Sequence, residues 1–105
     1  MNKIAIFGAN GRMGRVLIDA IAQSDNGKLT AAAVRAGSSL VGVDAGALAG
    51  IDHQDIPLVD KLDPYVNDIN VLIDFSLPAA LSANLNWCLH HHKPMVIGTT
   101  GLSAT

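Results

Sequence analysis

Apolar positions in the first third of the chain change from the period of a strand to that of a helix and back. Residues 4–7 form a short apolar run followed by glycine, which is typical of a strand buried on both faces of a sheet. A helix is predicted next, because apolar residues recur at helical spacing at Met13, Leu17, Ala20 and Ile21. Turn residues at 24–27 end this helix, and residues 29–34 predict a second strand.

The same alternation returns in the last third of the chain. Residues 71–75 predict a strand, and residues 76–78 predict the start of a helix. The apolar stripe of that helix consists of Leu81, Leu85, Cys88 and Leu89. Pro94 follows the helix, and residues 95–97 predict another short strand.

The middle of the chain has no strong period. We expect a long glycine-rich loop over residues 35–50, and such loops in compact domains are usually functional or mobile. Leu58-Val59 predicts a short strand, and residues 61–66 predict one or two helical turns.

Two strand–helix–strand units predict a parallel sheet joined by right-handed crossovers. The strands that begin at Ile4, Val71 and Met95 end in small or polar residues, namely Gly8, Ser76 and Gly98-Thr99-Thr100. Ligands of open parallel sheets bind outside the carboxyl ends of the strands. We therefore expect these residues to meet at one ligand-binding edge.

The composition narrows the class of protein. A chain of 105 residues supports one domain, and with 50% hydrophobic but only 4% aromatic residues its core must be mostly aliphatic. The net charge of -2 indicates no nucleic-acid partner, and no apolar run approaches the ~18–20 residues that cross a membrane. Cys88 is the only cysteine, so no disulfide forms within the chain and a cytoplasmic location is expected.

The stretch GANGRMG separates the first strand from the first helix and holds three glycines at intervals of three. Such a turn lets backbone amides approach a diphosphate, and the helix N-terminus adds about half a positive charge. We expect Gly8 to make the turn, Gly11 to open the helix and Gly14 to let the helix lie close to the sheet. Arg12 can point its guanidinium at phosphate oxygens. The usual dinucleotide-binding fingerprint, G-x-G-x-x-G, has glycine at the position of Asn10. The alternative is therefore a glycine-rich turn that binds no ligand.

Dinucleotide-binding domains have a second sequence signature about 20 residues beyond the glycines, where an Asp or Glu holds the ribose of NAD. Val34 and Arg35 occupy this place, and no carboxylate is available. Arg35, with Ser38 and Ser39 nearby, can instead receive a 2′-phosphate, which favours NADPH over NADH. The alternative is that Arg35 only extends into solvent.

With GANGRMG, RAGSSLVGVDAGALAG, VLIDFS and MVIGTTG in this order, the whole chain resembles the N-terminal domain of the 4-hydroxy-tetrahydrodipicolinate reductase (dihydrodipicolinate reductase) family. The resemblance implies an α/β Rossmann-type fold of three layers around a parallel sheet, incomplete relative to a full enzyme. It also implies a cytoplasmic reductase that transfers hydride from NADPH or NADH to 4-hydroxy-tetrahydrodipicolinate in diaminopimelate and lysine biosynthesis.

The resemblance assigns cofactor-binding roles to matching positions only. The pyrophosphate would lie on Gly8, Ala9, Asn10, Gly11, Arg12 and Met13. Arg35 would face the adenosine ribose or its phosphate. Family members often carry an acidic residue where Val34 stands, which makes NADP the preferred cofactor and NAD the less favoured one. The nicotinamide would lie in a crevice lined by Phe75, Ser76, Gly98, Thr99 and Thr100.

In this family the proton-donating histidine and the substrate-holding lysine belong to a second domain beyond residue 105. We therefore expect residues 1–105 to be the NAD(P)-binding domain, with the C-terminal substrate domain absent and no catalytic residue present. The family implies a homotetramer for the full enzyme, whereas this piece is expected not to be tetrameric, to bind NADPH weakly and to reduce nothing. The alternative is a non-catalytic nucleotide-binding module that acts as a sensor or regulator.

Four other features invite a functional interpretation. His90-His91-His92 lack the four-ligand spacing of a zinc site, so no metal site is expected. Cys88 falls on the predicted buried stripe and is expected to be a core residue rather than a nucleophile. Asp44 is expected to cap or stabilise the long loop, and Asp74 alone does not form an acid–base pair.

Overall fold

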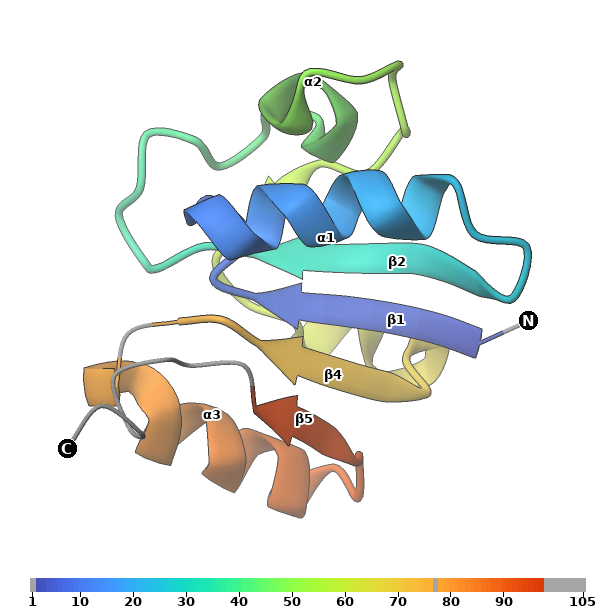
Figure 1. The fold of residues 1–105 in the computed structure, drawn as a ribbon. Helices are drawn as coiled ribbons and strands as arrows, with labels where there is room; N and C mark the ends of the chain where they lie inside the picture. The colour runs from blue at the N-terminus through green and yellow to red at the C-terminus, as the bar shows by residue number, and fades with distance from the viewer. Residues whose placement is uncertain (1, 77, 98–105) are drawn as a thin grey trace, which may run out of the picture.

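The computed structural model describes residues 2–76 and 78–97, which form a five-stranded parallel sheet flanked by helices (Figure 1). The strands are β1 (Asn2–Phe7), β2 (Gly27–Ala33), β3 (Leu58–Val59), β4 (Val71–Asp74) and β5 (Met95–Ile97). They lie in the order β3-β2-β1-β4-β5. The helices are α1 (Arg12–Ala22), α2 (Ala45–Ala49), the 3-10 helix η1 (Asp63–Asp68) and α3 (Pro78–His90).

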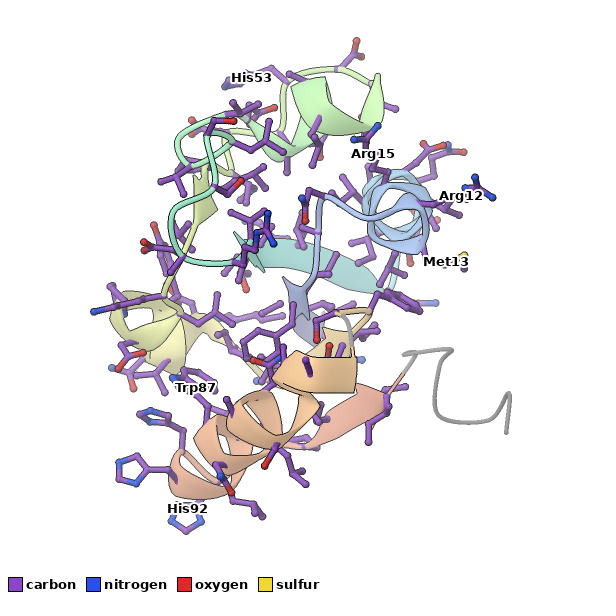
Figure 2. The ribbon with its side chains drawn as sticks, turned by 90° about the vertical axis from the view of Figure 1, so that its left-hand side faces the viewer. Arg12, Met13, Arg15, His53, Trp87 and His92 are labelled. Carbon is purple, nitrogen blue, oxygen red and sulfur yellow. The ribbon has the colours of Figure 1, made fainter. Side chains whose placement is uncertain are left out.

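The elements form the three layers expected from the sequence. Figure 2, viewed from the carboxyl ends of the strands, shows α1 and α2 on one side of the sheet and α3 and η1 on the other. Side chains of β1 alternate between the two cores: Ile6 packs with α1 and α2, and Ala5 packs with Cys88 of α3. Burial on both faces explains why residues 4–7 are continuously apolar.

All five predicted strands are confirmed, but the glycine-rich loop is not wholly irregular. The helix α2 lies within residues 35–50, where the sequence shows no helical period. Asp44 is its N-cap and accepts hydrogen bonds from the amides of Gly46 and Ala47. The prediction that Asp44 stabilises this loop is confirmed.

The predicted buried faces of the two long helices are partly wrong. In α1 the buried residues are Gly14, Ile18 and Ile21, and Leu17 is partly buried against the same core. Met13 is 46% exposed and Ala20 is exposed as well, so the predicted stripe is wrong at these two positions. The buried face is rotated from the predicted stripe because Gly14 allows the helix to approach its neighbours most closely.

The α3 stripe is confirmed at Cys88, which is 1% exposed. By contrast, Leu85 and Leu89 are 40% and 65% exposed, so the predicted stripe is wrong at these two positions. The side chain of Leu81 lies outside the described part of the structure.

The glycine turn between β1 and α1 has no room for a side chain at Gly8 or at Gly14. Gly8 has φ of +76°, and a Cβ there would lie 2.6 Å from the amide nitrogen of Ser76. A Cβ on Gly14 would lie 2.5 Å from the carbonyl oxygen of Gly8 and 2.6 Å from that of Ala9. Gly14 therefore lets α1 pack against the turn itself. At Gly11 the nearest atom to a Cβ would be 3.5 Å away.

We expect Gly14→Ala to lower the free energy of unfolding by about 2–3 kcal/mol, because backbone atoms must move to accept the methyl group. Gly11→Ala is the matched control at the same helix start, and we expect it to cost less than about 1 kcal/mol. Urea unfolding followed by circular dichroism measures both values. Equal losses in the two variants would contradict this account of the turn.

The side chain of Asp44 also ties α2 to the segment before β3. Its carboxylate accepts hydrogen bonds from the amides of Gln54 and Ile56, each at 2.9 Å, in addition to the two from α2. Burial alone would raise the pKa of Asp44, but the amides of Gln54, Ile56 and Ala47, together with nearby His53, lower it to about 2. The ionised carboxylate is thus the form that the fold stabilises.

Because the folded-state pKa of Asp44 is about 2 and its ordinary value is 3.8, its stabilising effect is complete above pH 3.8 and is lost as the pH falls toward 2. We expect Asp44→Asn to lower the free energy of unfolding by about 1–3 kcal/mol at pH 7. The difference from the wild-type chain should shrink on acidification to pH 2. Asp55→Asn, at a fully exposed carboxylate nearby, is the control, and urea titrations at each pH measure the effect.

None of the helices in the described ranges, 2–76 and 78–97, has the length and apolar character that a membrane span requires.

Candidate functional site

The strand order reverses direction at β1, which places a crevice at the carboxyl ends of β1 and β4. From β1 the chain crosses to β2 and β3 on one side, and β4 and β5 lie on the other side. Gly8 follows β1, and Phe75 and Ser76 follow β4. The amide of Phe75 donates to the carbonyl oxygen of Phe7 at 3.0 Å, so the two strand ends remain paired up to the crevice. Open parallel sheets bind ligands at such a reversal.

A cavity of about 580 Å³ occupies this crevice, which is a volume typical of a small-molecule site. It brings together the glycine turn, the end of β2, the link from β4 to α3 and the first turns of α3. Its lining residues are Phe7, Gly8, Asn10, Gly11, Ala33, Val34, Arg35, Ser38, Phe75, Ser76, Ala79, Ala80 and Asn84.

Six of the predicted site residues line this cavity: Gly8, Asn10, Gly11, Arg35, Phe75 and Ser76. Ala9 does not line it, because its side chain is fully buried in the core beneath the turn. Figure 2 shows Arg12 and Met13 on the outer side of α1, extending away from the strand ends. Gly98, Thr99 and Thr100 lie outside the described residues.

The backbone amides of the turn divide into two groups. Those of Gly8 and Ala9 both donate to the carbonyl oxygen of Ala33 at 3.1 Å, and that of Gly11 donates to Gly8. Gly11 is the N-cap of α1 and supplies no side-chain cap, and within the described structure the amides of Asn10, Arg12 and Met13 have no acceptor. The N–H groups available to an anion therefore come from Asn10 and the first turn of α1 rather than from Gly8 and Ala9.

A smaller cavity of about 300 Å³ extends the crevice beyond the end of β2. It shares five lining residues with the larger one, namely Phe7, Ala33, Val34, Arg35 and Asn84. It then reaches Lys61 and Trp87, and two carboxylates, those of Asp60 and Asp63, also line it. Arg35 is exposed and lines both cavities, so its guanidinium is the cation at their junction.

The structure also reveals a polar network that the sequence analysis missed. Asp74 is fully buried, and its Oδ1 accepts hydrogen bonds from the backbone amide of Ser76 at 2.7 Å and from the Ser76 hydroxyl. Its Oδ2 accepts a hydrogen bond from Asn84 Nδ2 at 3.1 Å. Asn84 lies one helical turn after Ala80 on the cavity side of α3, and no local sequence pattern marked it as a partner of Asp74.

The described residues hold no group of three or more His, Cys or Asp side chains that could bind a metal ion. The ring of His91 instead lies against Trp87, with centroids 4.3 Å apart. Trp87 makes an edge-to-face contact with Phe7 and donates its Nε1–H to Asp63 at 2.9 Å. The histidines therefore belong to the surface end of α3 and not to the cavity.

Cys88 lies in the core between α3 and the sheet, where its Sγ is 3.6 Å from Met95 Sδ. Burial, assisted by the charge of Asp74, raises the pKa of the Cys88 thiol to about 11. A thiol with such a pKa is a poor nucleophile at neutral pH, which supports the interpretation of Cys88 as a core residue.

We expect iodoacetamide to alkylate Cys88 in the folded chain about a hundredfold more slowly at pH 8 than in the urea-unfolded chain, because only the thiolate reacts. Mass spectrometry of timed samples measures both rates. Similar rates in the two states would show that the thiol is neither buried nor protonated as described.

The fold and the crevice define a Rossmann-type α/β domain with a cavity at the strand reversal. The family model described as "Dihydrodipicolinate reductase, N-terminus" matches residues 2–105, so the chain belongs to this family. The resemblance inferred from the four sequence motifs is thereby confirmed.

Known proteins agree with this assignment. The chain is 59% identical over 103 residues to the 4-hydroxy-tetrahydrodipicolinate reductase of Pseudoalteromonas atlantica, covering 98% of this chain and 39% of that protein. It therefore spans about two fifths of the length of the curated relatives it matches.

Two solved structures share the fold. A dipicolinate-bound dihydrodipicolinate reductase from Paenisporosarcina sp. TG-14 has a TM-score of 0.69 at 24% identity, covering 96% of this chain and 38% of that one. Aspartate semialdehyde dehydrogenase with NADP from Candida albicans has a TM-score of 0.72 at 17% identity, covering 96% and 30%. At these identities the likeness concerns the fold alone.

Proposed function

We propose that this chain is the NAD(P)H-binding domain of a 4-hydroxy-tetrahydrodipicolinate reductase. Family membership and the names of the relatives support the reaction. The observation that carries the binding role is the 580 Å³ cavity, which joins the N-terminus of α1 to Arg35 at the strand reversal. An extended anion with two phosphate-bearing regions fits this arrangement of donors.

In this proposal the pyrophosphate lies beside Asn10 and Gly11 and accepts hydrogen bonds from the amides of Arg12 and Met13. The side chain of Arg12, which points away in the structure, is not required for this contact. The bound cofactor supplies the hydride from its nicotinamide. The predicted nicotinamide contacts at Gly98, Thr99 and Thr100 form part of this proposal.

We further propose that NADPH is preferred to NADH. No carboxylate lines the larger cavity among the described residues, so no carboxylate there meets the ribose hydroxyls of NADH. Val34 is 5% exposed and offers no polar atom from its side chain. Arg35 and Ser38 line the cavity at the end of β2 and would hold the 2′-phosphate.

The remainder of the reaction belongs, in this proposal, to the part of the relatives that the chain does not match. That part would bind the small dicarboxylate substrate, deliver the proton and form the homotetramer of a cytoplasmic enzyme. Residues 1–105 alone would bind the dinucleotide without reducing the substrate. A regulatory nucleotide-binding module would share the cavity, but family membership favours the reductase.

We expect Arg35→Ala to weaken NADPH binding by about 1–3 kcal/mol and to leave NADH binding nearly unchanged, because only NADPH carries the 2′-phosphate. Isothermal titration calorimetry with each cofactor measures the two affinities. Lys28→Ala is the matched control, since it removes one positive charge from β2 at the opposite end of the strand.

Equal losses for both cofactors in Arg35→Ala would refute the assignment of the 2′-phosphate to this residue. Failure of the wild-type chain to bind either dinucleotide would refute the binding role as a whole.

A further inference from the structure

We propose that Asn84 recognises the exocyclic amine of the adenine base and that Asp74 is the positioning residue that orients the Asn84 amide. This inference rests on the proposed dinucleotide-binding function and extends it to base specificity. It is carried by the direction of each hydrogen bond in the Asp74–Ser76–Asn84 network and by the place of Asn84 in the cavity wall.

The network begins at a buried carboxylate that acts only as an acceptor. Asp74 is fully buried at the end of β4, and donors from Ser76 and Asn84 converge on its two oxygens. An ionised carboxylate has no hydrogen to donate, so every group that faces it must present an N–H or O–H. The Ser76 hydroxyl therefore directs its proton to Asp74 and offers its lone pair elsewhere.

These constraints orient the amide of Asn84. Its Nδ2 lies 3.1 Å from Asp74 Oδ2 and 3.0 Å from Ser76 Oγ, so both amide hydrogens are used. Rotating the amide by 180° would bring Oδ1 against the carboxylate and against a hydroxyl whose proton is already donated. Oδ1 is thus held on the other side, and no described residue donates a hydrogen bond to it.

Asn84 lines both cavities and supplies the one polar side chain that α3 contributes to the larger cavity among its described residues. Ala79 and Ala80 make the rest of this wall apolar. The glycine turn and Arg35 account for the phosphates, so the α3 wall is left for the flat apolar ring of the base. In an adenine nucleotide the exocyclic amine is the only N–H donor of the base, and it is the group that an oriented carbonyl oxygen would bind.

This geometry predicts discrimination between adenine and hypoxanthine, which carries a carbonyl oxygen in place of the amine. Two acceptors would then face each other, and the hydrogen bond from the exocyclic position is lost. We expect the wild-type chain to bind NADPH about tenfold more tightly than reduced nicotinamide hypoxanthine dinucleotide phosphate. Isothermal titration calorimetry with the two dinucleotides measures this ratio.

The ratio of the two affinities, measured in variants of Asn84 and Asn86, separates base recognition from an effect on folding. Asn84→Ala removes the acceptor and should bring the ratio to about one. Asn86→Ala removes an exposed amide from the same helix, lines neither cavity, and should keep the tenfold ratio. A ratio that stays tenfold in Asn84→Ala would overturn the assignment.

Asp74→Asn tests the positioning role with an isosteric change. Its amide oxygen would continue to accept the hydrogen bond from the Ser76 backbone amide, so its NH₂ would face Asn84. The Ser76 hydroxyl would turn its proton to Asn84 Oδ1, and the turned Asn84 amide would then present a donor to the base. The ratio should fall below one, in favour of hypoxanthine, which a purely structural loss would not produce. A retained adenine preference in a folded Asp74→Asn chain would overturn the positioning role, and the Asn84→Ala ratio decides the recognition independently if this variant does not fold.

Failure of the proposed function gives a different result. If the wild-type chain binds neither dinucleotide, the proposed function and this inference are both overturned. If it binds both with equal affinity, only the inference on Asn84 and Asp74 is overturned.

Discussion

The site depends on the close backbone contact between the glycine turn and the link from β4 to α3. Gly8 adopts a left-handed conformation and leaves no space for a side chain next to Ser76. The amides of Gly8 and Ala9 share the carbonyl oxygen of Ala33, so the same turn is also tied to the end of β2. One short segment therefore holds the ends of three strands, and the cavity is the space that remains above them. A larger residue at position 8 would separate the strand ends that form the floor of the cavity.

Two largely buried carboxylates organise the segments that follow the sheet. Asp44 gathers four backbone amides and fixes the connection between β2 and β3, whereas Asp74 gathers donors from Ser76 and Asn84 at the end of β4. Removing a charge from water is unfavourable unless hydrogen bonds replace the lost hydration. Both aspartates meet this condition with donors from a helix and from a connecting segment: α2 and residues 54–56 for Asp44, and α3 and Ser76 for Asp74. These contacts offset the cost of burial and join each helix to its neighbouring segment.

The sequence predicted the strands and the edge of the sheet where the cavity lies better than it predicted helix faces and side-chain directions. Short apolar runs ending in glycine or serine identify buried parallel strands because both faces must be apolar. The helix α2 could not be predicted from period, because Ala and Gly carry little amphipathic signal and its capping aspartate lies in a glycine-rich stretch. Met13 was assigned to the wrong face because the close approach at Gly14, a tertiary contact, rotates the helix. Asn84 was missed because its hydrogen bond reaches a carboxylate ten residues earlier, and no local pattern records that pairing.

Trp87 lines the smaller cavity beside the end of β1. It is the only tryptophan of the chain, it contacts Phe7 edge-on, and its indole N–H is held by Asp63 beside the smaller cavity. An indole with a fixed environment at the mouth of a binding crevice is an intrinsic optical probe. Its fluorescence should report occupancy of the crevice directly, so the wild-type chain needs no attached dye for ligand titrations.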